Sequence, residues 1–316
     1  MPGFVTHYLF GVKTYHTLED EELKTVLKNN KRVFSLGLQG PDFFFFYMPL
    51  AVSISPNIGS TIHKKDTNHF FEELIKAMNK IHGDRDFEIA AAYVMGFMGH
   101  YMLDKTVHPY VYGRVGITKG RRTLGVHYGL ESDIDREFLS KFKNMKPAEF
   151  SHSGAINTSS YERNVIGKLL SVAIKNTYGY DVSVEHIKAA INAFYLECAL
   201  LSDSTCLKHK VINGFESRVF GYACMSPLLI NEVVHSKDPC NEEHNTWHNP
   251  YAENHSDDSS VYDLFNKAKE EYSSKLPSMY EALLASYNNT DKSATILKQL
   301  GNLSYTTGLE ADKFEA

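Results

Sequence analysis

The sequence predicts an all-α protein, a bundle of many helices joined by long loops. Apolar residues recur at the three- and four-residue spacing of amphipathic helices, whereas the alternation typical of strands is scarce. Histidines and carboxylates also occur four residues apart within apolar sequence, a spacing that places side chains on one face of a helix. Together these observations favour a helical bundle with a metal cluster in a cleft.

In the first half of the chain, TLED at 17–20 resembles a capping box and predicts a helix to about residue 31. Residues 31–40 are expected to lead into a loop, GPDFFFFYMPL, which two prolines interrupt. Pro109 is expected to stop a later helix at His108. The helices expected after the loop cover 66–82, about 87–108 and 126–143, with a basic, glycine-rich loop at 113–125.

The second half continues the helical pattern, with a polar, histidine-rich loop at 233–258 that contains the single tryptophan. No composition break forces a boundary, so we expect a single all-α domain over 1–316. Its metal-binding core is expected over about 1–150 and its helical completion over about 151–316. The helices expected in the second half cover 159–176, 184–201, 207–219, 259–276 and 290–300.

Composition is that of an ordinary soluble globular protein, with 43% apolar and 22% charged residues. A net charge of −5 gives no sign of a nucleic-acid-binding protein, which normally carries a basic excess. The four cysteines form no CxxC pair and are expected to be reduced thiols. The start of the chain does not resemble a secretory signal, and the longest apolar run, 89–98, is too short for a transmembrane segment. These features predict a cytoplasmic protein.

The stretch GHYMLDKTVHPYV places His100, Asp104 and His108 at four-residue intervals after the apolar run AAAYVMGFM. On a helix the three side chains share one face. A second pair, His127 and Glu131, follows at the same interval. A buried carboxylate without a partner is costly, and nitrogen and oxygen donors in this arrangement suit zinc. We therefore predict a metal site rather than isolated hydrogen-bonded residues.

Further donors lie upstream. Asp42 follows Gly-Pro and precedes an aromatic run at 43–47, which is typical either of a pocket wall or of core; Gly-Pro-Asp is also a common turn. His7 lies among aromatic residues, and alone it would be an ordinary core or surface histidine. His63 and His69 both flank a helix start, and one of them is expected to be a ligand.

The ordered set His7, Asp42, His63 or His69, HxxxDxxxH and HxxxE resembles the zinc-dependent phospholipase C family, whose all-α fold is shared with P1 nucleases. The LGLQGPD stretch looks more like intracellular bacterial members than secreted toxins. The resemblance implies two or three zinc ions, with His63 preferred to His69. The implied ligand sets are Asp42, His63, His100 and Asp104 for one ion, His108, His127 and Glu131 for a second, and His7 with a shared Asp104 for a third.

This resemblance predicts a phosphodiester hydrolase that acts on a phospholipid or a smaller phosphoester, with Asp42 as a ligand and general base. Two departures are visible: the chain lacks the N-terminal tryptophan that completes the third site of secreted members, and residues 180–316 predict helices instead of a β-sandwich membrane domain. A P1-like single-strand nuclease or nucleotidase is an alternative, although those enzymes typically end the ligand list with HxxxD. A non-catalytic, zinc-stabilised binding protein is another.

Two loops have open roles at this point. The loop at 235–258 is either a lid over the pocket or a solvated segment. The basic loop GRVGITKGRR lies between the two helices that carry the predicted ligands, where it either meets a phosphate or faces solvent.

Overall fold

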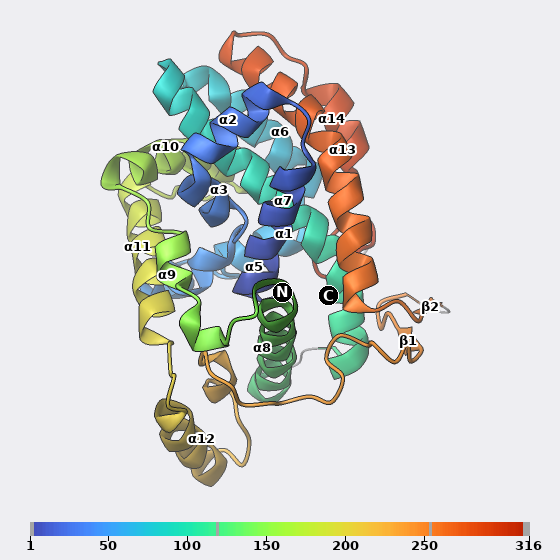
Figure 1. Ribbon diagram of the computed structural model, residues 1–316. Coiled ribbons are helices and arrows are strands. Elements are labelled where there is room, and N and C mark those ends of the chain that lie inside the picture. The colour runs from blue at the N-terminus through green and yellow to red at the C-terminus, as the bar shows by residue number, and fades with distance from the viewer. Residues whose placement is uncertain (1–2, 118–119, 253–254, 312–316) are drawn as a thin grey trace.

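The computed structural model describes residues 3–117, 120–252 and 255–311, and confirms the all-α prediction (Figure 1). The described residues form fourteen α-helices and one pair of two-residue strands, β1 (Trp247–His248) and β2 (Ser256–Asp257). None of the described helices is both long and apolar enough to cross a membrane. The longer helices are α1 (Phe4–Thr17), α2 (Glu21–Asn29), α6 (Thr67–Ala77), α7 (Asp84–Val115), α8 (Arg121–Lys143), α10 (Ser160–Tyr178), α11 (Val184–Leu200), α12 (Leu207–Val219), α13 (Val261–Tyr287) and α14 (Ser293–Leu300).

Short helices complete the bundle and carry several of the turns that shape the site. The short α-helices are α3 (Lys31–Gly37), α4 (Met48–Ser53), α5 (Ile58–Lys64) and α9 (His152–Ala155), and the 3-10 helices are η1 (Asp42–Phe45), η2 (Met78–Lys80), η3 (Pro147–Glu149) and η4 (Ser226–Leu228).

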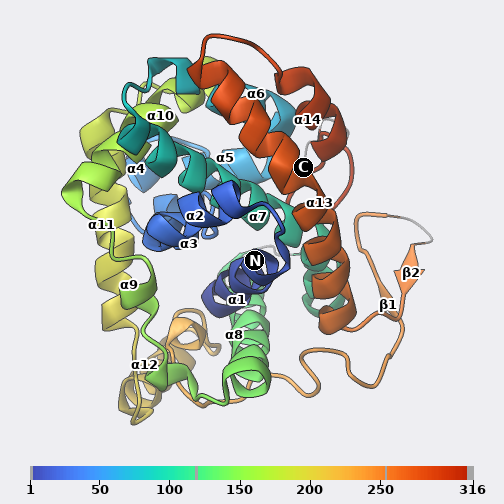
Figure 2. The same ribbon diagram turned by 45° about the horizontal axis from the view of Figure 1, so that its top comes forward.

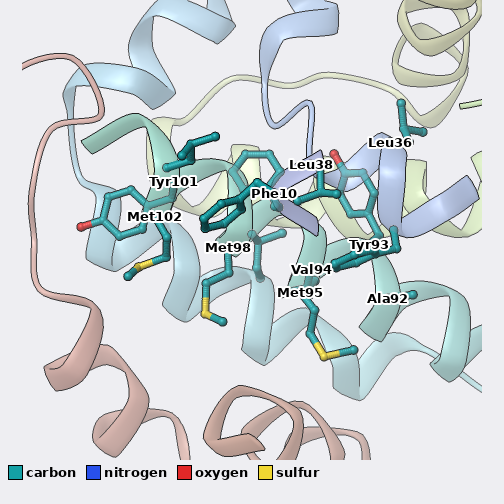
Figure 3. Packing of buried hydrophobic residues seen from close by; sticks show 14 of the residues in the cluster. Phe10, Leu36, Leu38, Ala92, Tyr93, Val94, Met95, Met98, Tyr101 and Met102 are labelled. Carbon is teal, nitrogen blue, oxygen red and sulfur yellow. The ribbon is translucent and has the colours of Figure 1, made fainter. Parts of the chain in front are cut away.

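Helix α7 is the axis of the fold, and α1, α3, α8, α10 and α13 pack around it (Figure 2). Every residue from Ile89 to Lys105 is buried, as expected for a helix that is apolar on all sides. Figure 3 shows Phe10 of α1 and Leu38 beside the methionines of α7. The backbones of α3 and α7 touch, because a Cβ on Gly96 would lie 2.3 Å from the carbonyl oxygen of Phe34. This packing fixes α7 against the N-terminal helices.

Several boundaries differ from the sequence predictions, and tertiary contacts accompany the difference in α7. The predicted stop at His108 is wrong, since α7 continues through Pro109 to Val115. A proline inside a helix costs about 3 kcal/mol, but here buried neighbours such as Val111 offset it. The C-terminal segment also packs on this turn, since a Cβ on Gly308 would lie 2.6 Å from the Lys105 carbonyl oxygen.

Other segments expected to be loops are partly helical. Residues 31–37 form α3, and the GPDFFFFYMPL segment forms η1 and the start of α4. The predicted loop at 113–125 belongs largely to the ends of α7 and α8, and residues 118–119 lie outside the described part of the chain. Helix α13 passes through Pro277 instead of ending near residue 276, and α1 was not predicted.

Candidate metal centre

Buried side chains form three groups that could hold metal ions. Within each group the ligand atoms lie within 4.8 Å of one another. They come from α1, η1, α5, α7 and α8, so the bundle gathers donors that are distant in the sequence. All eight residues of the preferred ligand set belong to these groups, whereas the alternative His69 does not. The groups are His7, His100 and Asp104; Asp42, His63 and His100; and His108, His127 and Glu131.

Asp104 lies at the centre of the cluster. Its Oδ1 is 3.1 Å from Nε2 of His7, and its Oδ2 is 3.1 Å from Nε2 of His100. The second oxygen is also 3.5 Å from Nε2 of His63. It is 3.6 Å from Nδ1 of His108 as well, so the carboxylate lies close to histidines of all three groups.

The third group is built on the facing sides of α7 and α8. His127 and Glu131 are one turn apart on α8, with Nε2 of His127 2.7 Å from Oε1 of Glu131. His108 of α7 points at the same carboxylate, with its Nε2 at 3.9 Å. Two helices thus present an imidazole and an imidazole–carboxylate pair to one point, as metal sites in bundles commonly do.

The structure separates the two histidines that the sequence left open. His63 is buried at the end of α5, and its Nε2 is 3.4 Å from both Oδ1 of Asp42 and Nε2 of His100. His69 is 48% exposed on α6 and lies 3.9 Å from Glu73, outside all three groups.

Backbone carbonyls orient three of the candidate ligands. Nδ1 of His63 is 2.7 Å from the Gly59 oxygen, and Nδ1 of His100 is 3.2 Å from the Leu38 oxygen. A carbonyl oxygen only accepts, so each Nδ1 donates and each Nε2 is left with a lone pair that faces the cluster. Outer partners of this kind fix the tautomer and ring orientation of metal-binding histidines.

A third carbonyl, that of Tyr305, accepts from Nδ1 of His108 at 2.7 Å. Tyr305 also donates its backbone N–H to the His63 carbonyl at 3.0 Å, and its ring packs 5.2 Å from the imidazole of His63. The C-terminal segment therefore closes the metal centre from a position that no sequence motif marked, because a main-chain carbonyl leaves no side-chain signal.

Burial sets the protonation states that metal binding requires. It lowers the pKa of His7, His63 and His100, and it lowers the pKa of His108 and His127 further. Burial alone would raise the pKa of Asp104, but its interactions with neighbouring histidines, above all His100 and His108, outweigh burial and bring that pKa well below the usual range. Neutral imidazoles around an ionised carboxylate are the forms that bind a metal ion.

Buried donors and acceptors without hydrogen bonds indicate what the cluster lacks. Both oxygens of Asp42, both oxygens of Asp104 and both ring nitrogens of His7 form no regular hydrogen bond with any described residue. Burial and the negative charge of Asp104 raise the pKa of Asp42 well above its usual range. Unpaired buried polar atoms are costly, and a cation between them removes that cost. The residues present therefore fit a metal ion.

A cavity of about 500 Å³ opens onto this cluster. Five candidate ligands line it, whereas His7, His100 and Asp104 lie deeper. Apolar side chains from η1, α11, η4 and the residues next to them also line it. The ligands in the lining are Asp42, His63, His108, His127 and Glu131, and the apolar residues include Phe45, Phe46, Phe194, Leu201, Pro227 and Leu228.

Comparison with protein families gives a match over residues 6–205 to the model described as zinc-dependent phospholipase C. The chain belongs to the zinc-dependent phospholipase C family. The match covers more than half of the chain and includes all eight candidate ligands. A search of curated proteins and a search of solved structures found no match. Family membership and the buried clusters together indicate zinc and a metal-dependent, phospholipase-like function.

A carboxylate that the motifs of the zinc-dependent phospholipase C family did not mark holds His7 in place. Asp135 of α8 accepts hydrogen bonds from the backbone N–H groups of Val5 and Thr6, at 2.9 and 2.8 Å, and from the Thr6 hydroxyl at 2.7 Å. It therefore caps α1, whose N-cap residue, Gly3, has no side chain to do so. Burial raises the pKa of Asp135 to about 6.

The aromatic run at 43–47 serves both expected roles in this family member. Phe43 and Phe44 are fully buried in the core, whereas Phe45 and Phe46 line the cavity. The basic loop leaves Arg121 and Arg122 exposed at the start of α8.

The histidine-rich segment at 235–258 was expected to be either a lid over the pocket or a solvated loop, and its described part fits neither description fully. Trp247 is buried against Tyr110 of α7, and its Nε1 donates to the Ser259 carbonyl at 3.1 Å. None of the described residues of 235–258 lines the cavity, so this part of the segment is not a lid over it.

Proposed function

We propose that the protein is a zinc-dependent phosphodiester hydrolase that cleaves phospholipids in the manner of a phospholipase C. The observation that carries the proposal is the cavity, whose lining combines candidate zinc ligands with apolar side chains. A phospholipid combines the same two parts, with an anionic phosphodiester beside apolar chains. The chemistry of the lining therefore matches the substrate class implied by the family.

The three groups would hold the zinc ions, with Asp104 shared between His7 and His100. Bound zinc lowers the pKa of a coordinated water and stabilises negative charge on phosphoryl oxygens. The protein contributes positioning, since the carbonyls of Leu38 and Gly59 fix the imidazoles that face the site.

Asp42 is proposed to act as a ligand and as the base that accepts a proton from the attacking water. It lies 3.4 Å from Nε2 of His63, lines the cavity and leaves both oxygens free of hydrogen bonds with described residues. A general base must reach the proton that it removes, and Asp42 is among the carboxylates placed at the cavity wall. Phe45 and Phe46 beside it would exclude bulk water and contact the apolar part of the substrate.

The experiment is hydrolysis of a soluble short-chain phosphatidylcholine by the zinc-loaded protein, with diacylglycerol and phosphocholine measured as products. Chelation should abolish turnover and added zinc should restore it. Asp42→Asn should reduce kcat by roughly a hundredfold or more, in line with loss of a general base. His69→Ala is the matched control, because His69 is exposed and lies outside the three groups, and it should retain full activity.

Single-stranded DNA assayed in parallel tests the nuclease alternative. Cleavage of DNA without cleavage of phosphatidylcholine would assign a P1-like nuclease instead. A protein that holds zinc but cleaves neither substrate would be a non-catalytic zinc-stabilised protein, and the proposal would be wrong.

A further inference from the structure

Helix α12 carries an exposed apolar stripe on the outside of the molecule. Leu207, Val211 and Phe215 are spaced by four residues, which places them on one face, and each is 63–65% exposed. Val219 continues the four-residue spacing, and the ring of Phe220 lies 6.5 Å from that of Phe215. Leu200 at the end of α11 and Met225 are further exposed apolar residues on the segments that flank α12. Single exposed apolar side chains are ordinary, but a contiguous set of this kind marks an interaction surface.

Helix α12 buries polar residues and exposes apolar ones, the reverse of an ordinary surface helix. Its two buried residues are His209 and Glu216. Glu216 accepts hydrogen bonds from the backbone N–H groups of Cys224, Met225 and Ser226 and from the Ser226 hydroxyl. The polar face is thus used to attach the helix to the protein. The apolar face contributes nothing to the core and points outward.

The position of α12 leaves this face accessible. Figures 1 and 2 both show α12 at one end of the molecule, beyond α8 and α11. Its main neighbour is η4, on the side of Glu216. At 13 residues the helix is about 20 Å long, too short to span a bilayer but suited to lie in its interface.

Charge indicates the partner. The exposed charged residues of α12 are all cationic, namely Lys208, Lys210 and Arg218, because its one acid is the buried Glu216. Arg121 and Arg122 are exposed at the start of α8, whose Gly125 touches the backbone of Ala223 just after α12. This cationic end belongs to a chain with a net charge of −5. An apolar face with a cationic surround complements an anionic lipid surface.

The same charges disfavour a second copy of the chain as the occupant. A two-fold contact through the stripe would bring each patch against itself, with like-charged Lys210 and Arg218 on both sides. Anionic headgroups would instead pair with these side chains while the apolar stripe enters the interface.

The segment that carries the stripe begins and ends at the cavity wall. Leu201 lies six positions before α12, and Pro227 and Leu228 follow it in η4, and all three line the cavity that opens onto the candidate ligands. A lipid surface held by α12 would therefore lie beside the cavity rather than on the far side of the protein.

We propose that α12 docks the protein on anionic phospholipid surfaces through Leu207, Val211 and Phe215, with Lys210 and Arg218 on the headgroups. Docking itself does not depend on catalysis. Its role in bringing substrate to the cavity rests on the proposed function.

The first test is sedimentation of the full chain with vesicles of phosphatidylcholine alone or mixed with phosphatidylglycerol. Wild-type protein should bind the mixed vesicles more tightly, and added salt should weaken binding. Val211→Ser with Phe215→Ser should reduce binding about tenfold or more, as expected for two apolar side chains withdrawn from the interface. Lys210→Glu with Arg218→Glu should remove the preference for phosphatidylglycerol.

Leu284→Ser on α13 is the matched control, since it replaces an exposed apolar residue in a different helix. Its vesicle binding should equal that of wild type. Circular dichroism and thermal unfolding check that each variant is folded. Equal binding by the wild-type protein and the Val211/Phe215 variant would overturn the proposal, as would no binding by wild type.

Activity separates this proposal from the proposed function. The Val211/Phe215 variant should cleave a monomeric short-chain phosphatidylcholine like wild type and lose activity only on vesicles. Vesicle binding that depends on Val211 and Phe215, without cleavage of either substrate, would support docking and contradict the phospholipase proposal. Concentration-dependent self-association that these substitutions abolish, without vesicle binding, would assign the face to a second copy and overturn docking.

Discussion

Oδ1 of Asp104 lies 3.1 Å from Nε2 of His7, and neither side chain has any exposed surface. Oδ2 of the same carboxylate makes the matching contact with His100, also at 3.1 Å. The two oxygens thus face different histidines, and Oδ2 also lies 3.5 Å from Nε2 of His63 in the second group. This geometry is what a carboxylate shared by two metal ions requires, and it makes Asp104 the residue on which metal content should depend most.

Asp104→Asn should therefore release more than one zinc ion, whereas His108→Ala should empty chiefly one site. The physical reason is that Asp104 lies within 3.6 Å of histidine nitrogens in all three groups, whereas His108 belongs to the third group alone. Zinc per chain, measured by inductively coupled plasma mass spectrometry after dialysis, checks the prediction. Full zinc content in both variants would show that the cluster is not the metal site.

His63→Ala should lower zinc content and His69→Ala should leave it unchanged. His63 is buried within reach of Asp42, His100 and Asp104, whereas His69 is 48% exposed beside Glu73. Zinc affinity by competition with a chromogenic chelator measures the difference, and loss of one ligand or its partner typically weakens affinity by roughly 10- to 100-fold or more. Equal affinities in the two variants would contradict the assignment of His63.

Tyr305→Phe should leave the free energy of unfolding of the metal-free protein unchanged or raise it. The buried Tyr305 hydroxyl has no hydrogen-bond partner among the described residues. Removing it therefore removes the free-energy cost of burying a polar group without a partner. Tyr101→Phe is the matched comparison, because its hydroxyl donates to the Leu300 carbonyl at 3.1 Å and its loss should cost about 1 kcal/mol.

Tyr305→Ala, in contrast, should lower the free energy of unfolding by about 3–5 kcal/mol, because it opens a cavity beside the buried rings of His63 and Tyr101. Denaturant titration of the metal-free forms measures all three variants. A larger loss from Tyr305→Phe than from Tyr101→Phe would mean that the Tyr305 hydroxyl has a partner.

His152 should make the metal-free protein less stable as the pH falls from 6.5 to 4. Burial lowers its pKa from 6.5 to about 4, although its Nδ1 lies 3.0 Å from the Phe150 carbonyl. In that window the unfolded chain binds a proton that the folded chain does not, so acid favours unfolding, by up to roughly 3 kcal/mol. Above pH 6.5 both states are neutral and the effect vanishes.

His152→Gln removes this titration. The difference in unfolding free energy between the variant and wild type should therefore shift in favour of the variant between pH 6.5 and 4 and stay constant above. Chemical denaturation at several pH values, with chelator present, measures it. A difference that does not change with pH would show that His152 titrates as if exposed.

The helical class and the clustering of the candidate ligands were predictable because both leave side-chain patterns. Amphipathic spacing marked most helices. His100 and Asp104, four residues apart, lie on one face of α7 as that spacing predicts. The match of the ordered motifs to one family made the prediction specific, since each motif alone is weak.

What the sequence did not reveal depends on partners distant in the chain. Helix α1 has no side-chain cap of its own and is capped by Asp135, 129 residues from Thr6. The C-terminal segment packs against the turn of α7 that contains Pro109. The carbonyl of Tyr305 orients His108 through the main chain, where residue type carries no information. Local pattern encodes none of these contacts.

The spread of the donors along the chain has a consequence for unfolding. His7 and Asp104 would be joined through one ion although about 100 residues separate them in the chain, and an ion that only the folded protein binds contributes its binding free energy to the stability of the fold. Zinc would then link α1 to α7 reversibly, in addition to its role in catalysis. Its removal should lower the free energy of unfolding of the whole bundle, not merely empty the site.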